Sequence, residues 1–177
     1  MSQPVAAKIL VVFFSRTGVT RKVAEALAHA ASADVEELHE ARSRRGFWGY
    51  LRSGFEATYR RPSSELLPLK RDPRRYDIVL VGSPTWSASL SSPVRAYLEQ
   101  QGALLPDTGL FVTCAGPRAD SVLAQMSSLL TKPALAKITL RDADVRHGPA
   151  VQIGEFLEAV LVAWEKRGND PRASSAG

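Results

Sequence analysis

The fold of this chain is decided by residues 8–20, which read KILVVFFSRTGVT. Residues 8–14 form a continuous apolar run, which is typical of a strand buried on both faces within a parallel sheet. The polar residues 15–18 then form a turn, and apolar side chains recur at helical spacing from Val19 to Ala30. A buried strand, a short polar loop and an amphipathic helix in this order predict the first unit of an α/β fold.

The same alternation continues along the chain. Further strands are predicted at Val35–Leu38, Ile78–Gly82, Gly109–Cys114 and Lys137–Leu140, and further helices at Pro93–Gln100, Asp120–Leu130 and Ile153–Lys166. Ser92 is expected as the N-cap before Pro93, and Gly168 as the residue just after the last helix. Strands that alternate with helices predict right-handed crossovers, and so a doubly wound five-stranded parallel sheet with helices on both faces.

Length and composition bound the function. With 177 residues, we expect one domain over residues 1–168 and a flexible tail over 169–177. The single cysteine excludes an internal disulfide, and the three histidines lack ligand-like spacing, so we expect no metal. Apolar runs are far shorter than the roughly 20 residues that span a bilayer, and no signal peptide is evident, which predicts a cytoplasmic protein.

Positive charge is concentrated in one long connection. Residues 42–75 contain ten Lys or Arg against three Asp or Glu, in a chain of net charge +5. The aromatic part, from Trp48 to Tyr59, is best interpreted as a crossover helix packed on the sheet or on a second copy of the chain. Two other interpretations stay open: a substrate or NADPH pocket near the binding loops, where arginines meet phosphate or carboxylate, and contact with a membrane surface or nucleic acid.

The segment after the first strand is the strongest candidate site. In open parallel sheets, ligands bind beyond the carboxyl ends of the strands, where the strand order reverses. Here residues 15–20 combine hydroxyl groups, a glycine and the free N–H groups of a helix N-terminus, which together favour phosphate binding. Neither G-x-x-x-x-G-K-[ST] nor G-x-G-x-x-G is present. The alternative is that the hydroxyl groups merely cap the helix.

Two further segments follow the third and fourth strands. Residues 82–89, GSPTWSAS, place Trp86 at a strand end, where it could cover a planar ligand or simply pack. Residues 114–117, CAGP, offer small side chains and accessible backbone. Cys114 followed by Arg118 has the spacing C-x3-R, not the C-x5-R of a phosphatase loop, so we interpret Cys114 as a buried residue at the strand end.

The motifs S-x-T-G-x-T at 15–20 and G-S-P-T-W at 82–86 resemble those of the flavodoxin family, over roughly Lys8 to Arg167. The resemblance implies FMN as cofactor and the strand order 2-1-3-4-5 known from flavodoxin itself. By this resemblance the FMN phosphate would be held by Ser15, Arg16, Thr17, Gly18, Val19 and Thr20. The isoalloxazine would be flanked by Pro84, Thr85, Trp86, Ser87 and Ala88, and its pyrimidine edge would meet the backbone of Cys114, Ala115 and Gly116.

These expectations define the predicted function. We expect an FMN-binding flavoprotein that transfers electrons or carries out NAD(P)H- or quinone-type redox chemistry, with no side-chain acid or base evident. The donor would be NAD(P)H or a reductase and the acceptor a quinone or a redox partner protein; no nucleic acid is expected, and a homodimer stays open. The alternative is a flavodoxin-fold regulatory or interaction module without redox turnover.

Two departures from the electron carriers of that family bear on this choice. Those carriers are typically acidic, whereas this chain is basic. They often place a glycine beside the flavin where residues 86–89 read WSAS, and a positive φ is costly for residues other than glycine. Both differences favour a reductase-like protein with two-electron chemistry.

Overall fold

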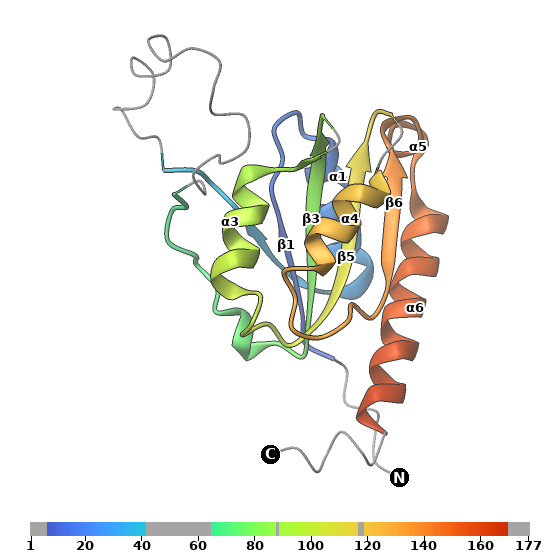
Figure 1. Ribbon diagram of the computed structural model, residues 1–177. Helices are drawn as coiled ribbons and strands as arrows, with labels where there is room; N and C mark the ends of the chain where they lie inside the picture. Colours follow the sequence, from blue (N-terminus) through green and yellow to red (C-terminus); the bar gives the residue numbers. More distant parts are fainter. Residues whose placement is uncertain (1–6, 42–64, 88, 117–118, 170–177) are drawn as a thin grey trace.

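The computed structural model describes residues 7–41, 65–87, 89–116 and 119–169. Within these ranges a sheet has the strand order β2-β1-β3-β5-β6, with the short β4 paired to β3 (Figure 1). The five strands of the main path are β1 (Ile9–Phe13), β2 (Asp34–Glu37), β3 (Ile78–Trp86), β5 (Asp107–Cys114) and β6 (Lys137–Arg141). All neighbours on this path are parallel, which confirms the predicted α/β fold and strand order.

Helices cover both faces of the sheet (Figure 1). One apolar cluster contains residues of α3 (Ser92–Gln101) and α4 (Ala119–Ser127), and the other contains residues of α1 (Val19–Ala31), α5 (Asp142–His147) and α6 (Ala150–Gly168). The strands supply both clusters alternately: Leu10 and Val12 belong to the first, and Val11 and Phe13 to the second. This alternation is why the first strand reads as an unbroken apolar run.

The third strand is longer than predicted. It continues from Ile78 to Trp86, because residues 82–84 pair with Phe111, Val112 and Thr113 of β5. Gly82 is required there, since a Cβ atom would meet the Phe111 ring at 2.0 Å. The turn-forming residues after Gly82 therefore continue the strand, because β5 offers partners for their backbone groups.

Several helix boundaries also differ from the predictions. Ser91, not Ser92, is the N-cap of α3, and its hydroxyl lies 2.9 Å from that of Ser83 instead of capping the helix. Gly168 is the last residue of α6, with Asn169 as C-cap. Helix α4 ends at Ser127 rather than Leu130, where the Ser127 hydroxyl donates to the Leu123 carbonyl, a bond that competes with helical geometry.

Three short elements were not predicted: strand β4 (Ser89–Leu90), helix α5 and the 3₁₀ turn Pro73–Arg75. Asp72 caps this turn by accepting from the Arg74 backbone N–H. Chain segments on either side of residues 42–64 pair at an antiparallel bridge between Glu40 and Leu66. The predicted helix over 48–59 and the predicted tail, beyond Asn169, lie outside the described residues.

Candidate functional site

The loop between β1 and α1 is held in shape by its own residues. Gly18 is the N-cap of α1 with φ 90°, and its N–H donates to the Ser15 hydroxyl at 3.1 Å. A side chain at the N-cap would be disfavoured at this φ, which explains the glycine. The N-cap itself therefore makes no side-chain capping bond, and of the loop hydroxyl groups that of Ser15 accepts from the N-cap N–H.

The first turn of α1 presents free donors. The backbone N–H groups of Val19, Thr20 and Arg21 precede the first intrahelical bond, which Lys22 donates to the Gly18 carbonyl, and no described residue accepts from them. Arg16 and Thr17 are exposed, and the first turn contains no acidic residue. This helix end is therefore suited to an anion.

The Thr20 side chain does not take part in this donor set. It is buried, and its hydroxyl lies 2.8 Å from that of Thr113 on β5. Of the predicted contacts, Thr20 therefore offers only its backbone N–H to the loop. Its side chain instead ties the start of α1 to the strand that leads to Cys114.

The predicted segment after β3 forms a hairpin. Trp86 pairs with Ser89 and Thr85 with Leu90, both antiparallel, through β4 (Ser89–Leu90). Ser87 in the turn has φ 47°, which is the left-handed conformation that glycine adopts at low cost. The hairpin therefore adopts this conformation although residues 86–89 contain no glycine. Ala88 lies outside the described residues.

Aromatic rings from two loops meet at this edge. Phe14, which follows β1, contacts Trp86 edge to face, with ring centroids 5.5 Å apart and planes at 88°. Both rings are half-buried. Phe14 was not among the predicted site residues, although it lies directly after β1 and directly before the loop.

Thr85 carries an unusual hydroxyl. Its Oγ1 atom is buried and has no hydrogen-bond partner among the described residues. A buried polar atom without a partner costs about 1–3 kcal/mol, so an atom of this kind at a strand end fits a ligand that would bond it. Pro84 next to it is half-buried and pairs with Thr113 in the sheet.

The segment after β5 combines a buried thiol with open backbone. Cys114 is 4% exposed, and burial raises the pKa of its thiol, which opposes a role as nucleophile. Ala115 and Gly116 are exposed, and a Cβ atom at Gly116 would meet nothing within 4 Å. The predicted buried strand-end role of Cys114 is thus confirmed, with an accessible backbone beyond it.

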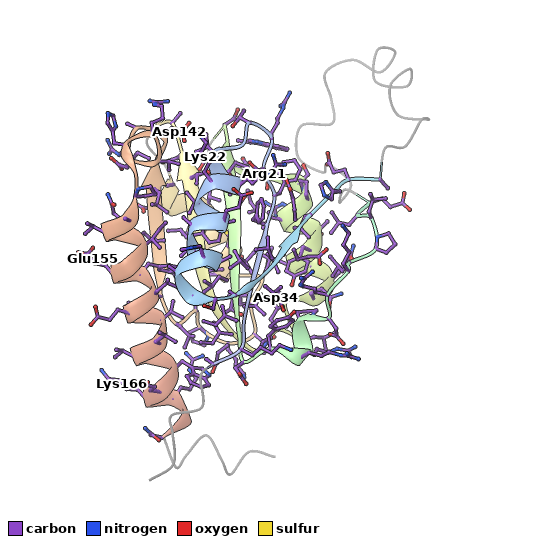
Figure 2. The ribbon with its side chains drawn as sticks, turned by 180° about the vertical axis from the view of Figure 1, so that it is seen from behind. Arg21, Lys22, Asp34, Asp142, Glu155 and Lys166 are labelled. Atoms are coloured by element: carbon purple, nitrogen blue, oxygen red, sulfur yellow. The ribbon has the colours of Figure 1, made fainter. Side chains whose placement is uncertain are left out.

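The three segments lie side by side. Strands β1, β3 and β5 are parallel neighbours, so residues 14–20, 84–87 and 113–116 share the carboxyl edge of the sheet. The strand order reverses at β1, because β2 lies on one side of it and β3 on the other, and ligands bind at such a point in open parallel sheets. Figure 2 shows Arg21, Lys22 and Asp142 near this end of the molecule and Asp34 farther from it. Arg21 is paired with Glu37 at 2.6 Å.

The described end of the basic connection lies elsewhere. Lys70 donates its backbone N–H to Glu36, and the Arg71 side chain donates to Asp34, so this stretch runs along β2 away from the loops. Arg74 and Arg75 belong to the 3₁₀ turn just before β3 begins. The pocket interpretation concerned the aromatic part of the connection, which lies outside the described residues.

Among residues 7–41, 65–87, 89–116 and 119–169, no helix has the length and apolarity needed to cross a bilayer. Nor do these ranges contain a group of three His, Cys, Asp or Glu side chains placed to hold a metal ion.

This geometry was compared with that of known proteins and families. The family model described as Flavodoxin matches residues 8–116. No match is found among curated proteins. A flavoprotein from Lactobacillus acidophilus, solved in complex with FMN, is similar with a TM-score of 0.58 and 21% identity over 80% of this chain and 98% of that one.

Two further solved structures share the fold. The flavodoxin-like, WrbA-like protein from Agrobacterium tumefaciens gives a TM-score of 0.56 at 16% identity, covering 90% of this chain and 98% of that one. An NADH:FMN oxidoreductase in its apo form gives 0.54 at 14% identity, covering 94% and 93%. At these identities the likeness concerns the fold alone.

Proposed function

This chain belongs to the flavodoxin family, and from that premise we propose that it is an FMN-dependent redox protein. Its electron donor would be NAD(P)H or a reductase, and its acceptor a quinone or a redox partner protein. Similar folds in a flavoprotein solved with FMN and in an NADH:FMN oxidoreductase support this assignment. We expect the protein to act in the cytoplasm, where NAD(P)H is available.

One observation carries the proposal: an anion-binding helix end, a pair of aromatic rings and an open backbone segment meet at one edge of the sheet. We assign the FMN phosphate to the N–H groups of Val19, Thr20 and Arg21 and to the side chains of Ser15, Arg16 and Thr17. The free donors and the lack of acid in the first turn fit a dianion.

The ring system is assigned to the aromatic side of the same edge. Trp86 and its neighbours in sequence Pro84, Thr85, Ser87 and Ala88 would flank the isoalloxazine, and the backbone of Cys114, Ala115 and Gly116 would meet its pyrimidine edge. The partnerless hydroxyl of Thr85 supports a polar ligand atom near β3. The chemistry supplied by bound FMN is reversible transfer of electrons or hydride.

The chain's own contribution is to bind, orient and shield. The Thr20–Thr113 contact fixes the start of α1 against β5, and the Phe14–Trp86 contact fixes the two loops against each other. Both contacts hold the binding groups in place before the ligand arrives, which lowers the entropy cost of binding. We assign no side-chain acid or base to the reaction.

The test first measures FMN binding to the purified full chain, with the quenching of flavin fluorescence as the readout. A matched pair of exposed threonines provides the variants: Thr17→Glu adds a negative charge to the loop, and Thr131→Glu adds the same charge outside it. We expect Thr17→Glu to weaken FMN binding at least tenfold, because like charges repel, and Thr131→Glu to leave it unchanged.

Loss of flavin colour on anaerobic addition of NADPH or NADH would then assign direct reductase activity. Reduction only in the presence of an added reductase would assign the carrier role. A chain that binds no FMN at micromolar concentration would contradict the proposal. It would favour the alternative, a regulatory or interaction module without redox turnover.

A further inference from the structure

A second, strongly basic site lies away from the binding loops. It is a cleft of about 620 Å³, and its lining includes five cationic side chains, those of Lys8, Lys70, Arg71, Arg74 and Arg75. Clefts of roughly 300–1,000 Å³ are the size class that holds small-molecule ligands.

The cleft is at the opposite edge of the sheet. Lys8 directly precedes β1, and Arg75 and Tyr76 directly precede β3, so these residues lie at the amino ends of the strands whose carboxyl ends carry the loops. In Figure 1 the turn at Pro73–Arg75 lies at the end of the sheet away from the β3–β4 hairpin. The five residues of β1 alone separate the two edges by roughly 16 Å at about 3.3 Å per residue.

Two of the arginines are held in place by carboxylates. Arg71 donates to Asp34 at 3.1 Å, and the Tyr76 hydroxyl donates to the other oxygen of Asp34 at 2.7 Å. Arg74 forms a two-pronged contact with Asp72, with both distances 2.9 Å. These bonds lower the pKa of both carboxyl groups, so the ion pairs persist at neutral pH and stiffen the cleft wall.

The other three cations have no carboxylate partner. Among the described residues, neither Lys70 nor Arg75 forms an ion pair, and the Lys8 ammonium lies over the Tyr76 ring, 4.8 Å from its centroid. The wall therefore retains an excess of positive charge, which is reduced by Asp77 and Glu36, whose carboxylates accept from the backbone N–H groups of Lys8 and Lys70. Such an excess within a concave site is matched by a compact ligand with several negative charges.

We propose that this cleft binds a small molecule that carries two or three linked phosphates, of the nucleoside di- or triphosphate class. Lysine ammonium groups suit phosphates as point charges, and the guanidinium of Arg75 can bond two phosphate oxygens at once. An acidic protein segment is the less fitting ligand, because its carboxylates are singly charged and spaced along the backbone, whereas linked phosphates bring several negative charges into one cleft. The site is independent of the flavin proposal.

The experiment is a calorimetric titration of the FMN-saturated full chain with ATP and with tripolyphosphate at 0.15 M salt. The test variant is Lys70→Ala/Arg75→Ala, and the control is Lys137→Ala/Lys166→Ala, which removes equal charge from exposed positions on β6 and α6. We expect saturable binding of one probe molecule per chain, weakened at least tenfold in the test variant and less than twofold in the control.

Each other outcome would overturn the proposal. Equal weakening in both double variants would mean non-specific charge attraction, and the absence of saturable binding would mean that there is no site. Tighter binding of polyglutamate than of either phosphate probe would identify an acidic protein segment. Loss of probe binding in Thr17→Glu would place the probe in the loop after β1, whether or not the chain binds FMN.

Discussion

The hydroxyl groups of Thr20 and Thr113 lie 2.8 Å apart in the buried layer between α1 and β5. Thr20 lies in the first turn of the helix that follows the first strand, and Thr113 is the residue before Cys114. This contact links two of the three segments assigned to FMN, so the geometry of the proposed site depends on a hydrogen bond buried beneath it.

The bond between Thr20 and Thr113 should contribute to the free energy of unfolding. Thr20→Val or Thr113→Val alone leaves one buried hydroxyl without its partner, which costs about 1–3 kcal/mol in the free energy of unfolding. The double variant removes both hydroxyl groups and should recover most of the loss, because valine has nearly the same shape as threonine. Urea denaturation of the four proteins in a double-mutant cycle measures the coupling, and additive losses would contradict it.

Gly18 should resist substitution for a backbone reason alone. A Cβ atom there meets nothing within 4 Å, yet the residue has φ 90°, so Gly18→Ala should lose about 1–2 kcal/mol of stability. Gly154 in α6 is the matched control, since a Cβ atom there also meets nothing within 4 Å and no positive φ is required. Gly154→Ala should gain about 0.5–1 kcal/mol, and thermal denaturation distinguishes the two signs.

Ser87 should behave in the opposite way to Gly18. Its φ of 47° is unfavourable for serine, so Ser87→Gly should stabilise the protein by about 1 kcal/mol. Ser89→Gly, in the same hairpin but on the strand β4, has no such strain to relieve and should destabilise by about 0.5–1 kcal/mol. Equal effects of the two changes on the urea midpoint would show that Ser87 is not strained.

Acid should weaken the contacts of Asp34 in a defined direction. Hydrogen bonds from Tyr76 and then from Arg71 lower its pKa below the ordinary value of 3.8, so the folded state binds fewer protons than the unfolded state. The stabilisation is therefore fully present above that value and is lost as the pH falls through the lowered pKa. The gap in urea midpoint between wild type and Asp34→Asn should shrink from pH 6 to pH 3.

Glu155→Gln serves as the control for this pH series. Glu155 is exposed on α6, far from Asp34 in Figure 2, and forms no ion pair within the described part of the chain. A midpoint gap for Asp34→Asn that stays constant between the two pH values would show that its carboxylate contributes nothing to folding.

The sequence by itself determined the elements and their order. The apolar run at 9–13 can only be buried on both faces, and the helical spacing from Val19 onward follows from the same local pattern, so the fold class and the loop at 15–20 could be predicted from the residues themselves. The strand order came only from the resemblance to the flavodoxin family. Such patterns depend on neighbouring residues, which the sequence displays directly.

Only the tertiary structure decided which groups meet. Residues 82–86 read as a turn, yet they extend β3 because β5 lies beside them, and Thr20 reads as a loop hydroxyl, yet it bonds Thr113 across the core. The sequence did not indicate where residues 70–75 lie, and the chain carries Arg71 along β2 and Arg75 to the amino end of β3. Contacts between residues far apart in sequence depend on how strands pair, and local propensity contains no record of that pairing.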